Sequence, residues 1–156
     1  MDLNILGTED SQISLDEDFL LISRLVDEAD GHLEGLVNLV FCDDDTIQQL
    51  NKQYRHKDKV TDVLTFTYYE GETQPDELLG EVVISVPQTK RQAPDQEWDD
   101  FADFSLAAAF EMELYKLFIH GLLHMRGYDH EVDEDYRVMK LLEDKIMKSF
   151  LSSRKI

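Results

Sequence analysis

The stretch LYKLFIHGLLHMRGYDH, residues 114–130, combines the strongest helix signal of the chain with three of its five histidines. It closes an apolar run from Phe101 through Met125 that is interrupted by acidic residues and one lysine. A run of this length exceeds an ordinary strand and predicts the longest helix of the chain, largely buried. Inward positions recur there at spacings of three and four, at Leu106, Phe110, Leu114, Leu117 and Gly121. Gly127 is well placed to end the helix.

The histidine spacing predicts a metal site. On a helix, His120 and His124 stand one turn apart on the same face, with Cβ atoms about 6 Å apart, so both imidazoles can reach one ion. Gly127 can then turn the chain back and bring His130 from the loop as a third ligand. Three histidines leave a fourth coordination position open, as at catalytic zinc sites. One zinc ion fits this set better than nickel or copper, although neutral imidazole also binds those metals.

The same spacing matches the metzincin protease pattern H-E-x-x-H-x-x-G-x-x-H, except that Gly121 stands where the protease carries its general-base glutamate. Without that glutamate, water attack on a peptide carbonyl would need a base from elsewhere. Phosphodiester hydrolysis fits the site better, because a metal can lower the pKa of water to about 7 and neutralise a phosphoryl oxygen. A nearby cationic side chain can stabilise the remaining charge.

Outside this stretch, the pattern predicts strands at Leu3–Leu6, Leu36–Phe41, Asp62–Tyr69 and Leu79–Val86. Helices are expected between a Ser14/Glu17 capping box and Gly31, and after an N-cap at Asp43–Asp45. A last helix should follow from about Val132, with Val138, Leu142, Ile146 and Phe150 turned inward. A polar segment with Pro94 and Trp98 separates the last strand from the long helix. This order predicts a mixed sheet with helices on it, an α+β or α/β layered domain.

Composition limits the class of protein. The 156 residues suit one domain spanning residues 1–156, and 42% hydrophobic with 31% charged residues is ordinary for a soluble globular protein. No uncharged apolar run approaches the roughly 20 residues of a membrane span, and no secretory signal is evident, so we expect a cytoplasmic protein without membrane contact. Cys42 is the only cysteine, so any metal must be held by His, Asp or Glu.

The charge distribution points in two directions. A formal net charge of −19 argues against nucleic acid as a partner, because phosphate binding draws its affinity from Lys and Arg. One local basic cluster runs against this trend, at Lys52, Arg55, His56, Lys57 and Lys59. It is either a solvated stretch at a helix end or a site that attracts phosphate despite the overall field.

Three stretches resemble one known family. HGLLHMRGYDH resembles the H-G-x-L-H-x-x-G-Y-D-H signature of the YbeY endoribonucleases, bacterial zinc-dependent enzymes of ribosomal RNA maturation and ribosome quality control. NKQYRHKDKVTDVLTF, residues 51–66, resembles that family's N-x-x-Y-R-x-x-D-x-P-T-D-V-L-S-F, and LLGEVVIS, residues 78–85, resembles its L-G-D-I-V-I-S strand. The three stretches occur in the family's order, and the chain length agrees.

The resemblance implies an α+β fold with a four-stranded mixed sheet and a zinc-hydrolase-like histidine motif on the longest helix. It implies that His120, His124 and His130 are the zinc ligands and that Arg55 assists catalysis, since a guanidinium can hold a phosphate through paired hydrogen bonds. Arg55 could otherwise be a surface residue paired with Asp58 or Asp62. The implied partners are single-stranded ribosomal RNA and the ribosome or its proteins.

Several points depart from the family pattern or stay open. Val60 stands where the family usually has proline, and Met125 with Arg126 replaces a mostly apolar pair, but no proposed ligand is lost. Asp129 is either an acceptor that fixes an imidazole tautomer or a helix N-cap. Two rival functions are a non-catalytic ribosome-assembly factor with a closed, structural metal site, and a metallohydrolase for peptides or small molecules, which Gly121 disfavours.

Overall fold

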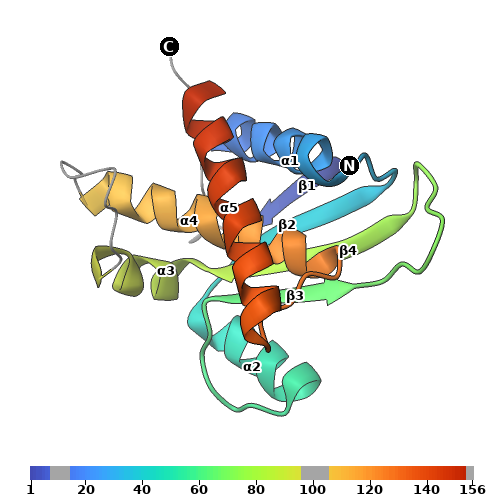
Figure 1. The fold of residues 1–156 in the computed structure, drawn as a ribbon. Helices are drawn as coiled ribbons and strands as arrows, with labels where there is room; N and C mark the ends of the chain where they lie inside the picture. Colours follow the sequence, from blue (N-terminus) through green and yellow to red (C-terminus); the bar gives the residue numbers. More distant parts are fainter. Residues whose placement is uncertain (8–14, 96–105, 154–156) are drawn as a thin grey trace.

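The computed structural model of the chain describes residues 1–7, 15–95 and 106–153 (Figure 1). The elements follow in the order β1 (Asp2–Gly7), α1 (Asp16–Asp30), β2 (Leu36–Cys42), α2 (Asp44–Arg55), β3 (Val63–Thr67), β4 (Leu78–Ser85), α3 (Val86–Gln92), the 3-10 helix η2 (Ala93–Asp95), α4 (Leu106–Met125) and α5 (Asp133–Ser153). The predicted capping-box residue Ser14, Trp98 and the expected first residues of the long helix, 101–105, lie outside the described residues.

The four strands form one mixed sheet in the order β1-β2-β4-β3. β1 pairs with β2 and β2 with β4 in parallel, whereas β3 runs antiparallel to β4. This arrangement confirms the predicted α+β fold with a four-stranded mixed sheet. It also makes β3 an edge strand, with one side of its backbone free of strand partners among the described residues.

The helices divide unequally between the two faces of the sheet. α1, α4 and α5 lie on one face, and α2 lies on the other (Figure 1). The first face carries the larger core, which includes the ring contacts of Phe19 with Phe41, Tyr115 and Phe118. The α2 face carries a small core of Cys42, Ile47, Leu64 and Val83. We refer below to the α4 face and the α2 face.

Helix α4 is buried on most sides because it lies between the sheet and the helices α1 and α5. Its buried residues between positions 109 and 125 include Met112, Leu114, Phe118, Leu122 and Met125. A helix that is apolar nearly all round needs such an enclosed place. The prediction of a largely buried helix that ends at Met125 is therefore confirmed over its described residues. The prediction that it is the longest helix is not confirmed there, because α4 has 20 described residues and α5 has 21.

Local sequence signals explain where the other helices begin. The Asp43 side chain accepts a hydrogen bond of 2.8 Å from the backbone N–H of Thr46 and caps α2, as predicted. The Ser85 hydroxyl accepts from the N–H of Gln88 and caps α3, in which Pro87 occupies the first turn. The residue that ends the last strand thus also starts a short helix.

Two further predictions need correction. Val138 is 46% exposed, and Met139, 2% exposed, takes the inward position on α5. The inward stripe of that helix therefore runs through Met139, Ile146 and Phe150, one residue later at its start than the apolar pattern indicated. Strand β3 ends at Thr67, two residues before the predicted end at Tyr69.

Among the described helices, none combines the length and apolar character needed to cross a bilayer.

Candidate metal centre

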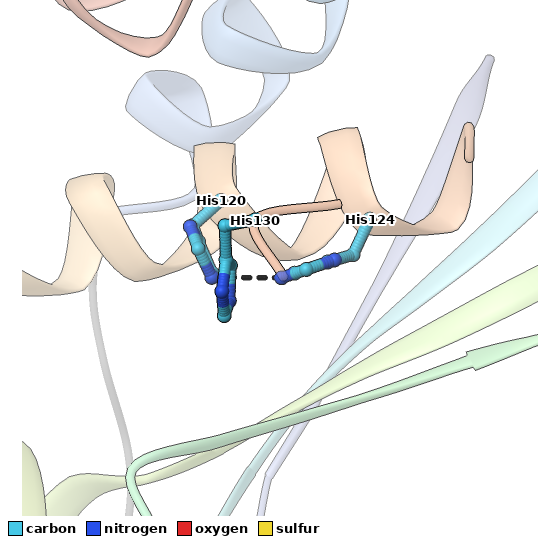
Figure 2. A group of neighbouring side chains, drawn as sticks. All are labelled: His120, His124 and His130. Atoms are coloured by element: carbon cyan, nitrogen blue, oxygen red, sulfur yellow. Dashed lines mark hydrogen bonds between the residues drawn. The ribbon is translucent and has the colours of Figure 1, made fainter. Parts of the chain in front are cut away.

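Three imidazoles converge beneath the C-terminal half of α4, on the side that faces the sheet (Figure 2). His120 and His124 come from successive turns of α4, and His130 comes from the loop before α5. Their ring centroids lie 4.4, 5.0 and 5.5 Å apart, and one nitrogen from each ring lies within 4.8 Å of the others. Among the described residues, this histidine triad is the group of side chains that could hold a metal ion.

Hydrogen bonds fix which nitrogen each helical histidine presents. The Nδ1 of His120 lies against the carboxylate Oε1 of Glu143, and the Nδ1 of His124 lies 2.9 Å from the carbonyl oxygen of Tyr128. An ionised carboxylate and a carbonyl oxygen can only accept hydrogen bonds. Each Nδ1 therefore carries the proton, and each Nε2 keeps its lone pair. The lone pairs therefore point toward the centre of the triad.

The spacing of these nitrogens fits a shared cation. The two Nε2 atoms of His120 and His124 lie 3.0 Å apart. Two lone pairs at this distance repel each other unless a positive charge lies between them. A tetrahedral ion with metal–nitrogen bonds of about 2.0–2.1 Å separates its ligand atoms by about 3.3 Å, close to the observed value. The donor set and its geometry thus fit a metal ion.

The electrostatic setting keeps at least one ring ready to bind. The pKa of His124 lies below its usual value, mainly because burial disfavours the charged ring, with smaller contributions from positive charge on His120 and His130. A lowered pKa leaves His124 neutral near pH 7, the form that binds metals.

A tight turn brings His130 back to the helix. Gly127 has φ +99° and donates its N–H to the carbonyl of His124 at 3.0 Å, while the N–H of Tyr128 donates to the carbonyl of Leu123 at 3.0 Å. These two bonds form a Schellman motif, which needs a residue in the left-handed region at this position and so favours glycine. The predicted role of Gly127 in ending α4 is confirmed.

A buried arginine ties this turn to α1. Arg126, whose side chain is 5% exposed, pairs with Asp27 and Asp30 and donates to the carbonyl of Gly31 at 2.7 Å. The hydroxyl of Tyr128 donates to Asp30 at 2.6 Å, and this bond is the main reason why the pKa of Tyr128 is raised. Arg126 departs from the mostly apolar family pattern at this position, and its buried charge is balanced by Asp27 and Asp30.

Gly121 marks the closest approach of α4 to the sheet. A Cβ atom at this position would lie 2.6 Å from Cγ1 of Val82 and 3.2 Å from Oγ1 of Thr65. Real side chains do not tolerate the first of these distances unless a neighbour moves. The place that a metzincin gives to its general-base glutamate is therefore sterically closed in this protein.

Arg55 shares a cavity of about 450 Å³ with the histidine triad and strand β3. Its Nη2 donates to the carbonyl of Thr65 at 2.6 Å, and its guanidinium lies 5.1 Å from the centre of the Phe66 ring. These contacts replace the alternative pairing with Asp58 or Asp62. The structure thus brings together the four predicted site residues, which come from α2, α4 and the loop before α5.

Sequence reasoning missed the residues that orient the triad. Glu143 contacts His120 from α5, 23 positions away, and it lies between Met139 and Ile146 on the inward stripe of that helix. The sequence pattern placed the inward stripe at Val138 and Leu142, so Glu143 became an inward residue only once the structure had placed Met139 there. Asp129 fills neither predicted role: its carboxylate accepts from the N–H of His130 at 2.7 Å, and α5 begins only at Asp133.

Asp62 is a further acidic residue that lines the cavity. One of its carboxylate oxygens accepts from the backbone N–H of Val63 at 2.8 Å, and the other accepts from the side-chain amide of Gln92 at 3.0 Å. These bonds hold the carboxylate in place at the start of β3. From the sequence, Asp62 was expected only as a partner for Arg55.

Comparisons with known proteins agree with this site. The family model described as Endoribonuclease YbeY matches residues 7–151. The Endoribonuclease YbeY of Desulforamulus reducens is 38% identical over 87% of this chain and 89% of its own, and that of Ureaplasma parvum serovar 3 is 41% identical over 74% and 68%. The solution structure of TM1509 from Thermotoga maritima aligns over 97% of this chain and 93% of its own, with a TM-score of 0.58 and 27% identity. The chain belongs to the YbeY endoribonuclease family.

Proposed function

We propose that this protein is a zinc-dependent endoribonuclease that hydrolyses single-stranded ribosomal RNA in rRNA maturation and ribosome quality control. The observation that carries the proposal is the shared cavity, which Arg55 lines together with three convergent imidazoles. The family to which the chain belongs supports RNA as the substrate. The proposed active unit is a single domain of residues 1–156, acting in the cytoplasm.

In this proposal, His120, His124 and His130 hold one zinc ion. Zinc, when bound, supplies a Lewis acid for a phosphoryl oxygen and lowers the pKa of water. The protein contributes the orientation of the ligands, because Glu143 and the Tyr128 carbonyl keep both helical rings in the tautomer that presents Nε2. These contacts remove the need to reorganise the ligands during the reaction.

Arg55 is the proposed phosphate-binding residue. A guanidinium has five N–H donors, and the bonds to the carbonyls of Thr65 and Tyr54 leave others for the substrate. These donors would stabilise the charge that grows on the phosphoryl oxygens as a water oxygen attacks phosphorus and the bond to the leaving oxygen breaks. The proton of the attacking water must pass to a base; the protease position at Gly121 has no room for one.

The net charge of −19 makes a second partner part of the proposal. A strongly acidic protein gains little affinity for RNA from its overall field. We therefore propose docking to the ribosome or to a ribosomal protein as the source of additional affinity. Such docking would deliver the RNA at high effective concentration.

The direct test measures zinc and RNA cleavage together. Protein purified without an affinity tag should contain one equivalent of zinc by elemental analysis and should cut a labelled single-stranded RNA more rapidly than its duplex. The His120→Ala, His124→Ala double variant should lose both the metal and the cleavage. Cleavage that persists in this variant would refute the assignment.

The same preparation separates the rival functions. An assembly factor with a structural site would unfold on chelation without having cleaved RNA, and it would show a saturated coordination sphere by X-ray absorption. A peptidase would cleave a peptide library and leave RNA intact. Either result would replace the proposal.

A further inference from the structure

An aromatic surface lies on the α2 face of the sheet, at the edge formed by β3. We call it the aromatic shelf; it consists of Tyr54, Phe66 and Tyr68. Tyr54 is 52% exposed and Tyr68 is 53% exposed, although large aromatic side chains usually bury most of their area. The centroids of the Tyr54 and Phe66 rings lie 5.3 Å apart with the planes at 74°, so the two rings support each other without covering either one fully.

Strand geometry places Phe66 and Tyr68 on the same side. Side chains two positions apart point to the same face of a strand, and the pairing of Tyr68 N–H with the carbonyl of Leu79 at 2.8 Å continues the ladder past Thr67. The Tyr68 hydroxyl donates to Glu81 at 2.8 Å, opposite Phe66 on β4. This bond fixes the ring, and burial, Glu81 and the nearby Tyr54 raise the pKa of Tyr68 to about 12.

Arg55 connects the aromatic shelf to the metal cavity. Its guanidinium lies over the Phe66 ring at 5.1 Å and bonds to the carbonyl of Thr65, yet the same side chain lines the cavity with the histidine triad. Thr65 points to the opposite face, where it meets Gly121 of α4. Arg55 therefore spans the free edge of β3 and joins the two faces of the sheet.

Basic side chains follow Tyr54 of the shelf in the chain. Lys57 and Lys59 are exposed in the turn that follows α2, and within the described residues neither has an ion pair. Lys52 is also exposed but lies 3.8 Å from Asp58. This local positive charge contrasts with the net charge of −19 of the whole chain. Glu81 beside Tyr68 disfavours a phosphate directly on the shelf, whereas it leaves the ring faces open to uncharged bases.

We propose that the aromatic shelf stacks unpaired bases of a single RNA strand that crosses the edge of β3 on its way from the metal cavity. Aromatic faces and bordering cations are the two elements by which proteins hold single-stranded nucleic acid, the faces for bases and the cations for the backbone. A duplex cannot use this surface because its bases are already stacked on each other. The proposal rests on the proposed function and adds a physical reason for preference for single strands.

The test uses the full-length protein and a single-stranded 12-nucleotide RNA that carries 2-aminopurine, whose fluorescence falls when it stacks on a ring. We expect Tyr54→Ala and Tyr68→Ala each to weaken binding at least about fivefold and to abolish the fluorescence change. Tyr54→Phe should retain both, since the ring remains. Leu20→Ala removes a 49% exposed side chain from α1 and serves as the matched control.

The salt dependence of RNA affinity tests the exposed lysines after α2 separately. Lys57→Ala should lower the slope of log affinity against log salt by about 0.7, the value for one phosphate contact on a single strand. Lys148→Ala, an exposed lysine on α5, should leave the slope unchanged. An equal change in both variants would overturn the assignment of Lys57.

The outcomes separate this inference from the proposed function. If wild-type protein neither binds nor cuts single-stranded RNA, the proposed function fails and the inference with it. If the wild type cuts RNA while Tyr54→Ala and Tyr68→Ala bind with unchanged affinity and fluorescence, the function stands and the shelf is refuted. A thermal melt accompanies each variant; should Tyr54→Ala fail to fold, Tyr68→Ala and Tyr54→Phe decide the question.

Discussion

The two faces of the sheet differ in how much they bury and in what they expose. On the α4 face, three of the described helices pack around the larger core, and the enclosed helix α4 carries two of the three histidines. Among the described residues, the α2 face has four buried core residues and one helix, and it exposes basic and aromatic side chains near the edge of β3. A metal site needs ligands fixed to a few tenths of an ångström, whereas a flexible RNA strand needs an accessible surface.

The largest expected effect concerns the cores themselves. Phe118→Ala on the α4 face should lower the free energy of unfolding by about 4 kcal/mol, because Phe118 is fully buried and touches Phe19. Leu64→Ala on the α2 face should cost about 2–3 kcal/mol, since that core is small and close to solvent. Urea unfolding followed by circular dichroism measures both values. A greater loss for Leu64→Ala would reverse the ranking of the two faces.

The next effect tests whether the α2 face contributes to catalysis without holding the metal. Arg55→Ala should reduce kcat/KM for RNA about 100-fold and leave zinc content unchanged, because its guanidinium is proposed to contact phosphate. Arg55→Lys should recover only part of the rate, since lysine keeps the charge but not the paired donors. Arg24→Ala, an exposed arginine on α1, is the control. Loss of zinc in Arg55→Ala would contradict this division of roles.

A smaller effect is expected for the residue that orients a ligand from the α4 face. Glu143→Gln should weaken zinc binding about tenfold, because the neutral amide holds the protonated Nδ1 of His120 less strongly. Competition with a chromophoric chelator measures the affinity directly, independent of RNA cleavage. The neighbouring Asp144→Asn changes an exposed carboxylate that pairs with Lys140, and it should bind zinc like the wild type. Equal affinities in the two variants would assign Glu143 no role at the metal.

The smallest effect is an absence of reaction in the small core. Burial, followed by the charges of Asp43 and Asp44, raises the pKa of the Cys42 thiol to about 12. At pH 8 only about one thiol in ten thousand is then the reactive thiolate, and the side chain is 1% exposed. A thiol reagent should modify folded protein very slowly and unfolded protein at once. Rapid labelling of the native state would show that the α2 face opens easily.

Features that depend on nearby residues were predictable from the sequence. The triad follows from helix periodicity and one glycine turn, because all its members lie within eleven positions. The mixed sheet followed from strand patterns together with the family resemblance. The inward stripe of α5 was misplaced at Val138, since two adjacent apolar residues, Val138 and Met139, fit the helical pattern equally well until the packing against α4 chooses one.

Features that depend on distant residues could not be derived from pattern alone. The contact of Glu143 with His120 and the pairs of Arg126 with Asp27 and Asp30 join positions 23 to 99 residues apart. Their geometry exists only after the helices have packed. The placement of Arg55 in the cavity had the same difficulty, and there the family resemblance supplied what periodicity could not.

The close contact at Gly121 has a consequence for how this scaffold can change over generations. Replacement of Gly121 by glutamate would complete the metzincin motif, but the new side chain would have to displace Val82 of the sheet. Acquiring peptidase chemistry by this route thus requires coordinated replacements in β4 and α4, with unstable intermediates between them. The two motifs differ at one residue, yet the packing of α4 against the sheet prevents that single replacement from converting one site into the other.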